Sequence, residues 1–541
     1  MIANPLRLAI AAALLAPFAL GAQQPDLPSR IDKIFARFDR NTPGCAVGVA
    51  KDGRTLYTHG YGSANLEYGV PLTDSSVMES GSVAKQFTAA ALVLLQQDGK
   101  LSLDDDIRKY LPEVPDFGRT ITIRNLLTHT SGLRDQWGLL SIEGRGPGTQ
   151  VHSPETTLDL VTHQHSLNFP PGSAYLYSNT GYALAGIIVQ RVSGKSLRDF
   201  SQERLFGPLG MTHTQWRDDF TRVVANRATA YSPAKDGYRQ DMPFTNMIGN
   251  GGLLSTMDDL LKWNENLDRT TVGGPTLTPT LETRMQLTNG RLSFYALGLG
   301  VIDYDGVREV SHNGSTAGYK TVLARYPDQH VSVAVWCSNG GVNAGSLGHQ
   351  VADLVLIKPT PIAKATDASI QLSKAALAQW AGLYRDPVTN QVMNLVATET
   401  SLTAGGANAL VPLAATRFRM PNGEASFNRT NGKKSFVLVR AMGDSSRFEE
   451  IANAPAKLTL SDYTGRYVSD ELDVELRIIV RDGKLMLLRR PEEYLGLTPS
   501  YLDSFASPIG SLRFSRDARG RASGFAIFSN RALDIRFKRV R

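Results

Sequence analysis

Apolar and polar positions follow different periods in different parts of the chain. Near the N-terminus, 46–50 and 55–58 are strand-like runs on either side of the turn-rich segment 51–54, which predicts a hairpin. Further strand-like runs and one helical run come much later, at 307–310, 320–326, 331–337 and 344–357. Because the intervening segment is typical of helices and loops, the pattern predicts one sheet assembled from both ends of a region spanning about 25–357.

The pattern becomes helical directly after Ser82. Apolar residues then recur at helical spacing, at Phe87, Ala90, Ala91, Leu94 and Leu95, and Gly99 supplies a stop. The sequence therefore predicts that Ser82 stands at the N-terminus of a helix.

The C-terminal third has a different character. Pro359 and Pro361 mark 358–370 as a linker, and short alternating strands follow it. Two similar phrases, Trp380-Ala381-Gly382-Leu383-Tyr384 and Tyr463-Thr464-Gly465-Arg466-Tyr467, each open a run of strands and turns. This repeat predicts two small antiparallel β-barrel domains, at 371–455 and 456–541, after a larger domain at 23–357.

Composition supports several folded domains. The 541 residues exceed what one core of roughly 250 residues accommodates, and 42% apolar with 20% charged residues is ordinary for a globular chain. The net charge is +7, but basic residues cluster only at Arg536–Arg541, so no nucleic-acid partner is predicted.

The N-terminus carries a secretory signal pattern. Arg7 precedes an apolar run from Leu8 to Leu20, and small residues end at Ala22, where we expect cleavage of a signal peptide at 1–22. The run is shorter than the roughly twenty residues that span a bilayer, so we expect no stable membrane span after signal removal. A periplasmic or secreted location follows. Cys45 and Cys337 then form either one bridge or two buried thiols.

The candidate chemistry begins with Ser82 and Lys85. Their spacing puts a hydroxyl and an amine on one face of a helix, where a partly desolvated lysine can act as the base for a serine nucleophile. The Ser-x-x-Lys pattern alone is weak, because Ser232 and Lys235 match it in a segment typical of a turn. Only Ser82 opens an apolar helix and is followed by further polar motifs.

Two later motifs complete a plausible catalytic set. Tyr177 can relay a proton, and Asn179 can orient the lysine and hold a substrate amide. The third motif is His312-Asn313-Gly314-Ser315. Each motif alone is better explained as a turn, but the three in series favour a site. No Gly-x-Ser-x-Gly elbow, zinc-type histidine motif or phosphate-binding loop accompanies them, so neither metal nor cofactor is predicted.

These motifs resemble a known superfamily. Ser82-x-x-Lys85, Tyr177-x-Asn179 and His312-x-Gly314 are similar to the three motifs of class C β-lactamases, DD-peptidases and related esterases, over roughly 40–350. The resemblance implies an α+β fold, with a β-lactamase/transpeptidase-like antiparallel sheet flanked by helices. It also implies an acyl-enzyme and an oxyanion hole made by the backbone N–H groups of Ser82 and Ser315.

Within that superfamily the whole chain resembles three-domain D-aminopeptidases, in which two β-barrel domains follow the hydrolase domain. That branch places a loop of the last barrel at the active site, which implies a role for 491–503 and its acids Glu492, Glu493 and Asp503. The third motif has His312 where many relatives have lysine. A mostly neutral histidine predicts weak recognition of a free C-terminal carboxylate.

The first hypothesis is therefore an exported serine peptidase or amidase that is acylated at Ser82, with small peptide, amide or ester substrates. A second keeps the site but makes the enzyme an esterase or β-lactamase-like hydrolase. A third, a non-catalytic binder of cell-wall fragments, does not explain an activated nucleophile. The sequence leaves the oligomeric state and the substrate stereochemistry open.

Overall fold

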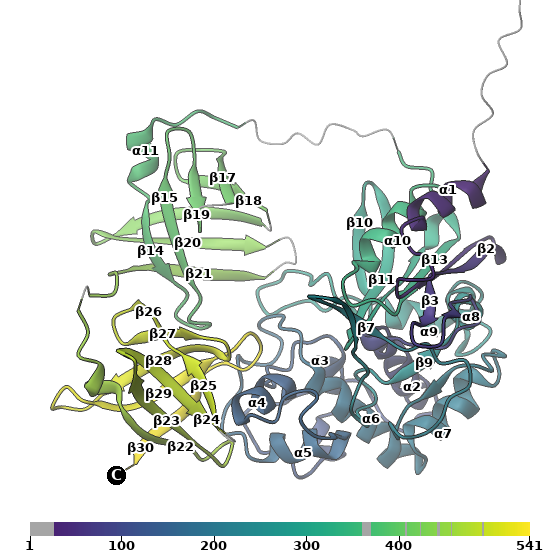
Figure 1. Cartoon of the computed structure of the whole chain (residues 1–541), viewed down its shortest axis with the longest axis horizontal. Helices are drawn as coiled ribbons and strands as arrows, with labels where there is room; N and C mark the ends of the chain where they lie inside the picture. The colour runs from purple at the N-terminus through teal and green to yellow at the C-terminus, as the bar shows by residue number, and fades with distance from the viewer. Residues whose placement is uncertain are drawn as a thin grey trace, which may run out of the picture.

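The computed structural model describes residues 26–359, 369–405, 408–421, 423–440, 444–455, 457–489 and 492–540. The predicted signal peptide and most of the predicted linker lie outside these residues. Figure 1 shows a mixed helix-and-sheet domain beside two β-domains that stack on each other.

The N-terminal domain is built on one antiparallel sheet with strand order β10-β11-β12-β13-β1-β2. β1 pairs with β13, so the sheet joins strands from both ends of the domain, and the predicted α+β fold is confirmed. Its strands are β1 (Cys45–Lys51), β2 (Arg54–Tyr61), β10 (Gly300–Tyr304), β11 (Val307–Thr316), β12 (Tyr319–Tyr326) and β13 (Val331–Cys337).

Alternation along the central strands gives the sheet two apolar faces. On β13, Val333 and Val335 face a cluster that includes α1 (Leu27–Phe35) and α10 (Ala344–Ala352). Ala334 and Trp336 face the main cluster, which includes α2 (Lys85–Gln97) and α8 (Met257–Arg269). Both faces are therefore covered by helices. α10 ends at Ala352, several residues before the predicted end of that helix.

The segment between β2 and β10 is mostly helices and loops, as predicted, with five short α-helices besides the longer α2, α8 and α6 (Asn179–Ser193). These helices are α3 (Ile123–Leu127), α4 (Gln136–Glu143), α5 (Pro154–Thr162), α7 (Leu197–Ser201) and α9 (Gly274–Leu281). The short strands are β3 (Ser63–Asn65), β4 (Val70–Pro71), β5 (Met78–Glu79), β6 (Gln215–Trp216), β7 (Tyr231–Ala234), β8 (Gly237–Gln240) and β9 (Leu253–Ser255).

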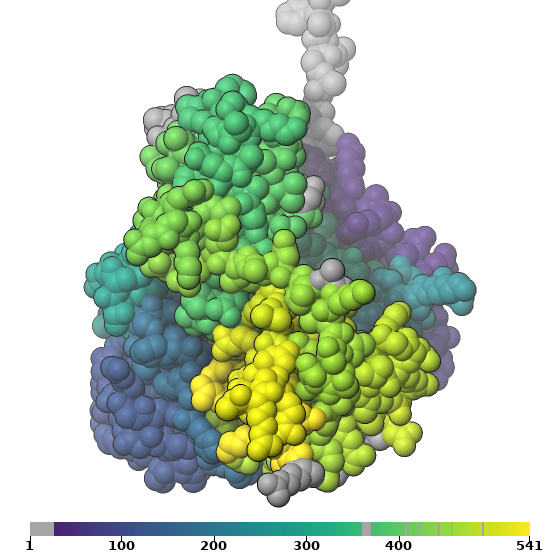
Figure 2. Space-filling view, turned by 90° about the vertical axis from the view of Figure 1, so that its left-hand side faces the viewer, coloured from purple at the N-terminus to yellow at the C-terminus, as the bar shows by residue number. Residues whose placement is uncertain are grey.

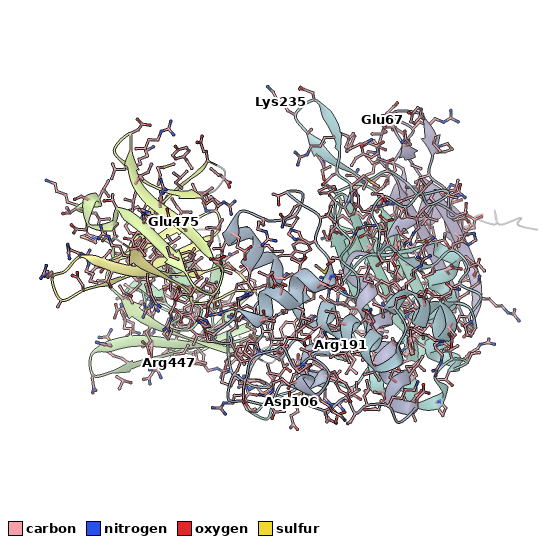
Figure 3. All side chains as sticks on the ribbon, turned by 90° about the horizontal axis from the view of Figure 1, so that it is seen from below. Glu67, Asp106, Arg191, Lys235, Arg447 and Glu475 are labelled. Carbon is pink, nitrogen blue, oxygen red and sulfur yellow. A yellow bond between two sulfur atoms is a disulfide. The ribbon has the colours of Figure 1, made fainter. Side chains whose placement is uncertain are left out.

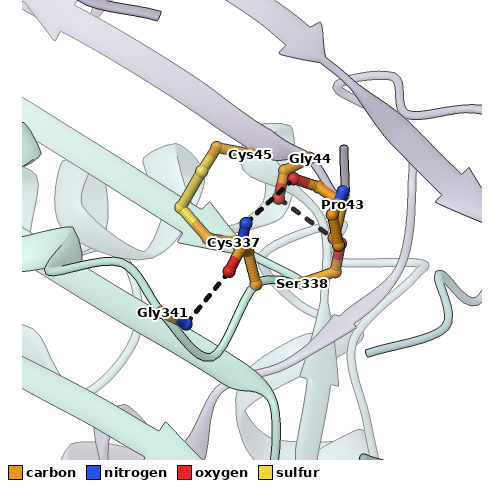
Figure 4. Close-up of a disulfide and its surroundings, with 7 residues drawn as sticks. Pro43, Gly44, Cys45, Cys337, Ser338 and Gly341 are labelled. Carbon is orange, nitrogen blue, oxygen red and sulfur yellow. Dashed lines mark hydrogen bonds between the residues drawn. A yellow bond between two sulfur atoms is a disulfide. The ribbon is translucent and has the colours of Figure 1, made fainter. Parts of the chain in front are cut away.

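Cys45 and Cys337 form a disulfide at the end of the β1–β13 pair, as Figure 4 shows. The two residues are directly opposite each other in the strand register, with an Sγ–Sγ distance of 2.11 Å. Of the two alternatives that the sequence left open, the structure has the bridge. Because the cysteines are 292 residues apart, the bridge ties together the two chain segments that build the sheet.

Two antiparallel β-domains follow. The first is a closed barrel of eight strands, β14 (Gly382–Arg385) to β21 (Ser445–Ile451). The second is a nearly closed sheet of nine, from β22 (Gly465–Ser469) to β30 (Ile535–Val540), in the order β25-β24-β23-β22-β30-β29-β28-β27-β26. Figure 2 shows the first barrel above the second.

The remaining strands of the first barrel are β15 (Val392–Ala397), β16 (Leu402–Ala404), β17 (Asn408–Pro412), β18 (Arg417–Met420), β19 (Gly423–Thr430) and β20 (Lys433–Arg440). Those of the second are β23 (Val474–Arg481), β24 (Lys484–Arg489), β25 (Glu493–Gly496), β26 (Thr498–Tyr501), β27 (Ser504–Ser507), β28 (Gly510–Arg516) and β29 (Ala522–Phe528).

The second barrel docks onto the N-terminal domain. Leu139 and Leu140 of α4 share one apolar cluster with the interior of this barrel. Beside them the buried Arg134 forms an ion pair with Glu471, at 3.0 Å between Nη1 and Oε2. The loop between β29 and β30 therefore lies against the N-terminal domain (Figure 1). Within the described residues, no helix has the length and apolar character needed to cross a membrane.

Candidate active site

Ser82 lies on a short 3-10 turn, Gly81–Ala84, and the α-helix α2 begins three residues after it, at Lys85. Ser82 was expected at the N-terminus of the α-helix itself, and it lies instead on the 3-10 turn that immediately precedes this helix. The tighter 3-10 turn brings the two side chains together, with 3.1 Å between Lys85 Nζ and Ser82 Oγ.

Lys85 has no exposed surface, and its Nζ makes hydrogen bonds with three polar groups. Its Nζ donates to Asn179 Oδ1 at 3.0 Å and to the carbonyl of Asn250 at 2.6 Å. Burial lowers the pKa of Lys85 well below its usual value, because the charged ammonium loses its hydration. Asp135 opposes this shift, and Arg531 adds to it.

Asn179 is held in turn by Asp135. The Asp135 carboxylate accepts hydrogen bonds from the Asn179 backbone N–H at 2.7 Å and from its Nδ2 at 3.0 Å. This fixes the amide so that its oxygen faces Lys85. The same carboxylate group caps α4 by accepting from the Trp137 backbone N–H. One aspartate therefore orders both the start of α4 and the partner of the lysine.

Tyr177 lies between the lysine and the second barrel. Lys85 Nζ is 4.9 Å from its ring centroid, and the Arg531 Cζ is 4.7 Å from it. Burial raises the pKa of Tyr177, and a hydrogen bond with Ser82 opposes part of that rise. His129 packs against the same ring at 4.2 Å between centroids, and its Nδ1 accepts from the Ser178 N–H. The phenol is therefore protonated near neutral pH and firmly placed.

The third motif runs along β11 close to the nucleophile turn. A Cβ on Gly314 would come within 2.0 Å of the Ser80 carbonyl oxygen, so only glycine lets the strand approach this closely. Gly81, with φ +50°, is equally constrained, since its Cβ would lie 2.6 Å from the Ser315 backbone nitrogen. The backbone nitrogen of Ser315 is thereby brought beside the turn that carries Ser82.

His312 is buried and neutral. Its Nδ1 donates to the Asn313 carbonyl at 2.5 Å, and its Nε2 accepts from the Tyr295 hydroxyl at 2.7 Å. Burial, with a smaller contribution from the Lys85 charge, lowers the pKa of His312 to about 3. The third motif therefore presents no cation near neutral pH.

These residues surround a cavity of about 870 Å³. Its walls include Ser82, Tyr177, Asn179, His312, Gly314 and Ser315, with Lys85 buried behind Ser82. The three motifs that are far apart in the sequence are thus brought into one site. Within the described residues no group of three or more His, Cys, Asp or Glu side chains is arranged to hold a metal ion.

The loop acids suggested by the sequence lie elsewhere. Asp503 accepts hydrogen bonds from Arg516 and Tyr463 inside the second barrel. Glu493 pairs with Arg489 on neighbouring strands, and Glu492 is exposed. Of the described barrel residues, Arg531, in the loop between β29 and β30, is the one that lines the cavity. A loop of the last barrel does reach the site, but it brings a cation.

The second Ser-x-x-Lys match takes no part in the cavity. Ser232 and Lys235 belong to the β7–β8 hairpin, and Lys235 lies at its tip, away from the body of the protein (Figure 3). The Ser232 hydroxyl donates to Asp241 Oδ2 at 2.5 Å. This pair forms a turn, as the surrounding Pro233 and Asp236-Gly237 predict.

Four residues of the site were not found from the sequence: Asp135, His129, the carbonyl of Asn250 and Arg531. His129 lies in Leu126–Leu133 and Asp135 in Ser131–Asp135, stretches between the first two motifs that also resemble the superfamily, and this resemblance was the available signal. A backbone carbonyl carries no signal in a sequence. Arg531 comes near Tyr177 only through the docking of a different domain.

Comparison with known proteins agrees with this geometry. The family model described as beta-lactamase matches residues 31–355, more than half of the chain. The chain belongs to the beta-lactamase family. A D-aminopeptidase of Brucella anthropi is 27% identical over 530 residues, which cover 92% of this chain and 95% of that relative. One from Brucella melitensis biotype 1 is 26% identical over 524 residues, covering 92% and 96%.

Solved structures show the same fold. An octameric penicillin-binding protein homologue from Pyrococcus abyssi has a TM-score of 0.54 at 24% identity, covering 78% of this chain and 99% of its own. The D-amino acid amidase from Ochrobactrum anthropi SV3 has a TM-score of 0.52 at 22% identity, covering 61% and 99%. Together with the family match, the relatives identify this chain as a D-aminopeptidase-like serine hydrolase of the beta-lactamase fold.

Proposed function

We propose that the protein is an exported amidohydrolase that cleaves small peptides or amides with a D-residue at the amino end, through an acyl-enzyme on Ser82. The observation that carries this proposal is the arrangement around Lys85 Nζ, which lies between one hydroxyl and two fixed carbonyl-type acceptors. A neutral amine has two N–H donors and one lone pair. With the donors directed to Asn179 and Asn250, the lone pair is left for the Ser82 hydroxyl.

The Ser82 hydroxyl then donates to Lys85 and loses its proton to it as its oxygen attacks the scissile carbonyl. Burial favours this step, because it keeps the lysine neutral before the reaction. Asn179 and Asp135 act as positioning residues for the base, since they fix the acceptor that one Lys85 N–H uses.

The developing oxyanion lies between the backbone N–H groups of Ser82 and Ser315, which the close approach of β11 brings together. Tyr177, a protonated phenol beside Ser82, passes its proton to the leaving amine and takes up the proton that Lys85 received from Ser82, so that Lys85 is neutral again. Water then attacks the acyl-enzyme along the reverse of the same path, with Lys85 again as the base. No step requires a metal or a cofactor.

The substrate class rests on the relatives, which are named D-aminopeptidases over nearly the whole length of this chain. The neutral His312 supports a substrate that does not depend on a cation in the third motif. Export rests on the signal pattern at 1–22, and the Cys45–Cys337 disulfide supports an oxidising compartment.

The experiment compares the mature protein with Ser82→Ala and with Ser232→Ala, which removes the other serine of a Ser-x-x-Lys pattern. Each is incubated with a fluorophosphonate and followed by mass, then assayed with D- and L-alanine p-nitroanilide. We expect labelling and D-anilide cleavage to fall by at least about a thousandfold in Ser82→Ala, the scale seen when a nucleophile is removed. Ser232→Ala should match the wild type.

Labelling that persists in Ser82→Ala would remove Ser82 as the nucleophile. Preference for the L-anilide would contradict the proposed stereochemistry while leaving the acyl-enzyme intact. Cleavage of neither anilide, together with rapid hydrolysis of esters or penicillins, would favour the esterase or β-lactamase-like alternative.

A further inference from the structure

The backbone of Arg531 is held in place by hydrogen bonds, while its guanidinium has no hydrogen-bonding or charged partner within the described part of the chain. Its carbonyl accepts from the Asp135 N–H and from Asn168 Nδ2, each at 3.0 Å. The neighbouring Leu533 N–H donates to Asn168 Oδ1, and Arg134 Nε donates to the Leu533 carbonyl. Among the described residues, the Arg531 guanidinium makes no hydrogen bond or ion pair and lies over the Tyr177 ring.

The carboxylates that line the cavity are all engaged. Glu79 is paired with Arg217 at 2.8 Å, and Glu309 with His349 at 2.9 Å. Asp241 accepts from the Ser232 hydroxyl. Arg531 is the one Lys or Arg among the described residues that line the cavity, and its charge favours an anionic ligand.

The position of Arg531 indicates which part of the substrate carries the anionic group. Tyr177 is the residue that passes the proton to the leaving amine, and Arg531 packs on the face of that same ring. Because the leaving amine takes its proton from Tyr177, a group that packs on this ring is placed to meet the leaving part of the substrate. His312, which relatives of this superfamily often replace by lysine, supplies no cation, so a carboxylate there depends on another residue.

We propose that Arg531 binds a carboxylate on the leaving group, so that the preferred substrates are dipeptides with a free C-terminus. This rests on the proposed amidohydrolase function and deepens it. The guanidinium fork matches a carboxylate with two parallel N–H···O bonds. It also reverses the expectation, drawn from His312 alone, that a free C-terminal carboxylate is weakly recognised.

The test uses D-alanyl-D-alanine and D-alanyl-D-alaninamide, which differ only in the terminal charge. In the wild type we expect kcat/KM to be about tenfold higher for the free acid, from one charge-assisted contact. At a pH above the acidic limb, where Lys85 is neutral in both proteins, Arg531→Gln should raise KM for the acid about tenfold and change kcat/KM for the amide much less. Arg531→Lys should retain part of the preference, because it keeps the charge without the fork.

The matched control is Arg481→Gln. Arg481 belongs to the same barrel and packs over the ring of Tyr494 at the same 4.7 Å, but it does not line the cavity. Arg481→Gln should leave kcat/KM unchanged for both the acid and the amide. If Arg531 serves only to dock the barrel, Arg531→Gln will lower kcat/KM for the acid and the amide equally, and the proposal fails.

The degree to which each dipeptide slows labelling of Ser82 by the fluorophosphonate tests the role of Arg531 independently of the proposed function. If neither dipeptide is cleaved, the substrate assignment of the proposed function fails, but the acid should still protect Ser82 about tenfold better than the amide, and only when Arg531 is present. Equal protection by the two, or protection by neither, overturns the role of Arg531. A preference that moves instead with a carboxylate on the acyl residue, tested with D-aspartyl-D-alaninamide, would overturn the assignment to the leaving group.

Discussion

The two C-terminal barrels begin with the same structural device but differ in what they contact. Tyr384 donates to the Trp380 carbonyl and Tyr467 to the Tyr463 carbonyl, both at 2.8 Å, so the repeated phrase forms the same local contact twice. The first barrel has an apolar cluster made only of its own residues. The cluster of the second barrel continues into α4 and α5 of the hydrolase domain.

The difference shows how a duplicated domain acquires a role at a site without changing its fold. The first barrel reaches the second through polar contacts, such as Asn390 Nδ2 to Ser511 Oγ at 2.9 Å. The second barrel instead buries a charged pair and places the β29–β30 loop beside Asp135 and Tyr177. Stability and activity should therefore be coupled in the second barrel and separate in the first.

The largest expected effect comes from removing one partner of the buried Arg134–Glu471 ion pair in the interface of the second barrel. Arg134 is fully buried and Glu471 nearly so, and Glu471→Ala leaves the guanidinium without its ion-pair partner. We expect a loss of about 3–5 kcal/mol in the free energy of unfolding. We also expect kcat/KM to fall at least tenfold, because Asp135 and Arg531 lie in the same interface. Chemical denaturation and steady-state kinetics measure the two effects.

The control is Glu450→Ala, which removes a partner from the partly exposed Lys434–Glu450 pair of the first barrel. It should change the free energy of unfolding by no more than about 1 kcal/mol and leave kcat/KM unchanged. Equal losses in the two variants would mean that the two barrels are not distinguished by their docking.

A second test perturbs the two interiors in the same way. Phe525 stacks on Phe537 in the second barrel, with centroids 4.8 Å apart, and Phe436 stacks on Phe448 in the first, at 4.7 Å. Phe525→Ala and Phe436→Ala should each cost about 3 kcal/mol, through lost burial and a cavity. Only Phe525→Ala should lower kcat/KM in the folded protein, since β29 and β30 carry the loop of Arg531.

Thermal unfolding measures the loss of stability in each variant, and the activity that remains after brief heating shows whether the active site is lost with it. If Phe436→Ala inactivates the enzyme at a temperature where its hydrolase domain is still folded, then the first barrel supports the site as well, and the contrast is wrong.

The sequence predicted most of what depends on local pattern. The strands of the sheet, the helix after Ser82 and the paired barrels follow from periods of two and 3.6 and from the repeated Trp380 and Tyr463 phrases. Ser82, Lys85, Tyr177, Asn179 and His312 were chosen as motifs, and the fold brings them together. These residues are recognisable because their spacing is itself constrained by turns and helix starts.

What the sequence could not predict depends on how the domains dock. The acids of 491–503 were expected at the site, yet this segment forms β25 and β26, and Asp503 is held by Arg516. Arg531 is a single cation in a short loop with no periodic signal. Its proximity to Tyr177 is set by Arg134, Asn168 and the apolar surface of α4, residues more than 350 positions away.

The smallest effect that we expect lies in the pH dependence of Ser82 labelling by the uncharged fluorophosphonate. Only neutral Lys85 can accept the serine proton, so the labelling rate falls as the pH drops through the pKa of Lys85. Burial is the main cause that lowers this pKa, while the Asp135 charge raises it and the Arg531 charge lowers it further. His312, with a pKa of about 3, does not titrate in the range measured.

Arg531→Gln removes a cation, which favours protonated Lys85 and raises its pKa. The acidic limb should therefore move to higher pH. Asp135→Asn removes an anion and should move the limb to lower pH, although it also weakens the hold on Asn179. Arg481→Gln, in the same barrel but remote from the cavity, should leave the limb in place. If both Arg531→Gln and Asp135→Asn moved the limb in the same direction, the base that titrates would not be Lys85. The second barrel would then act on the site through contact alone.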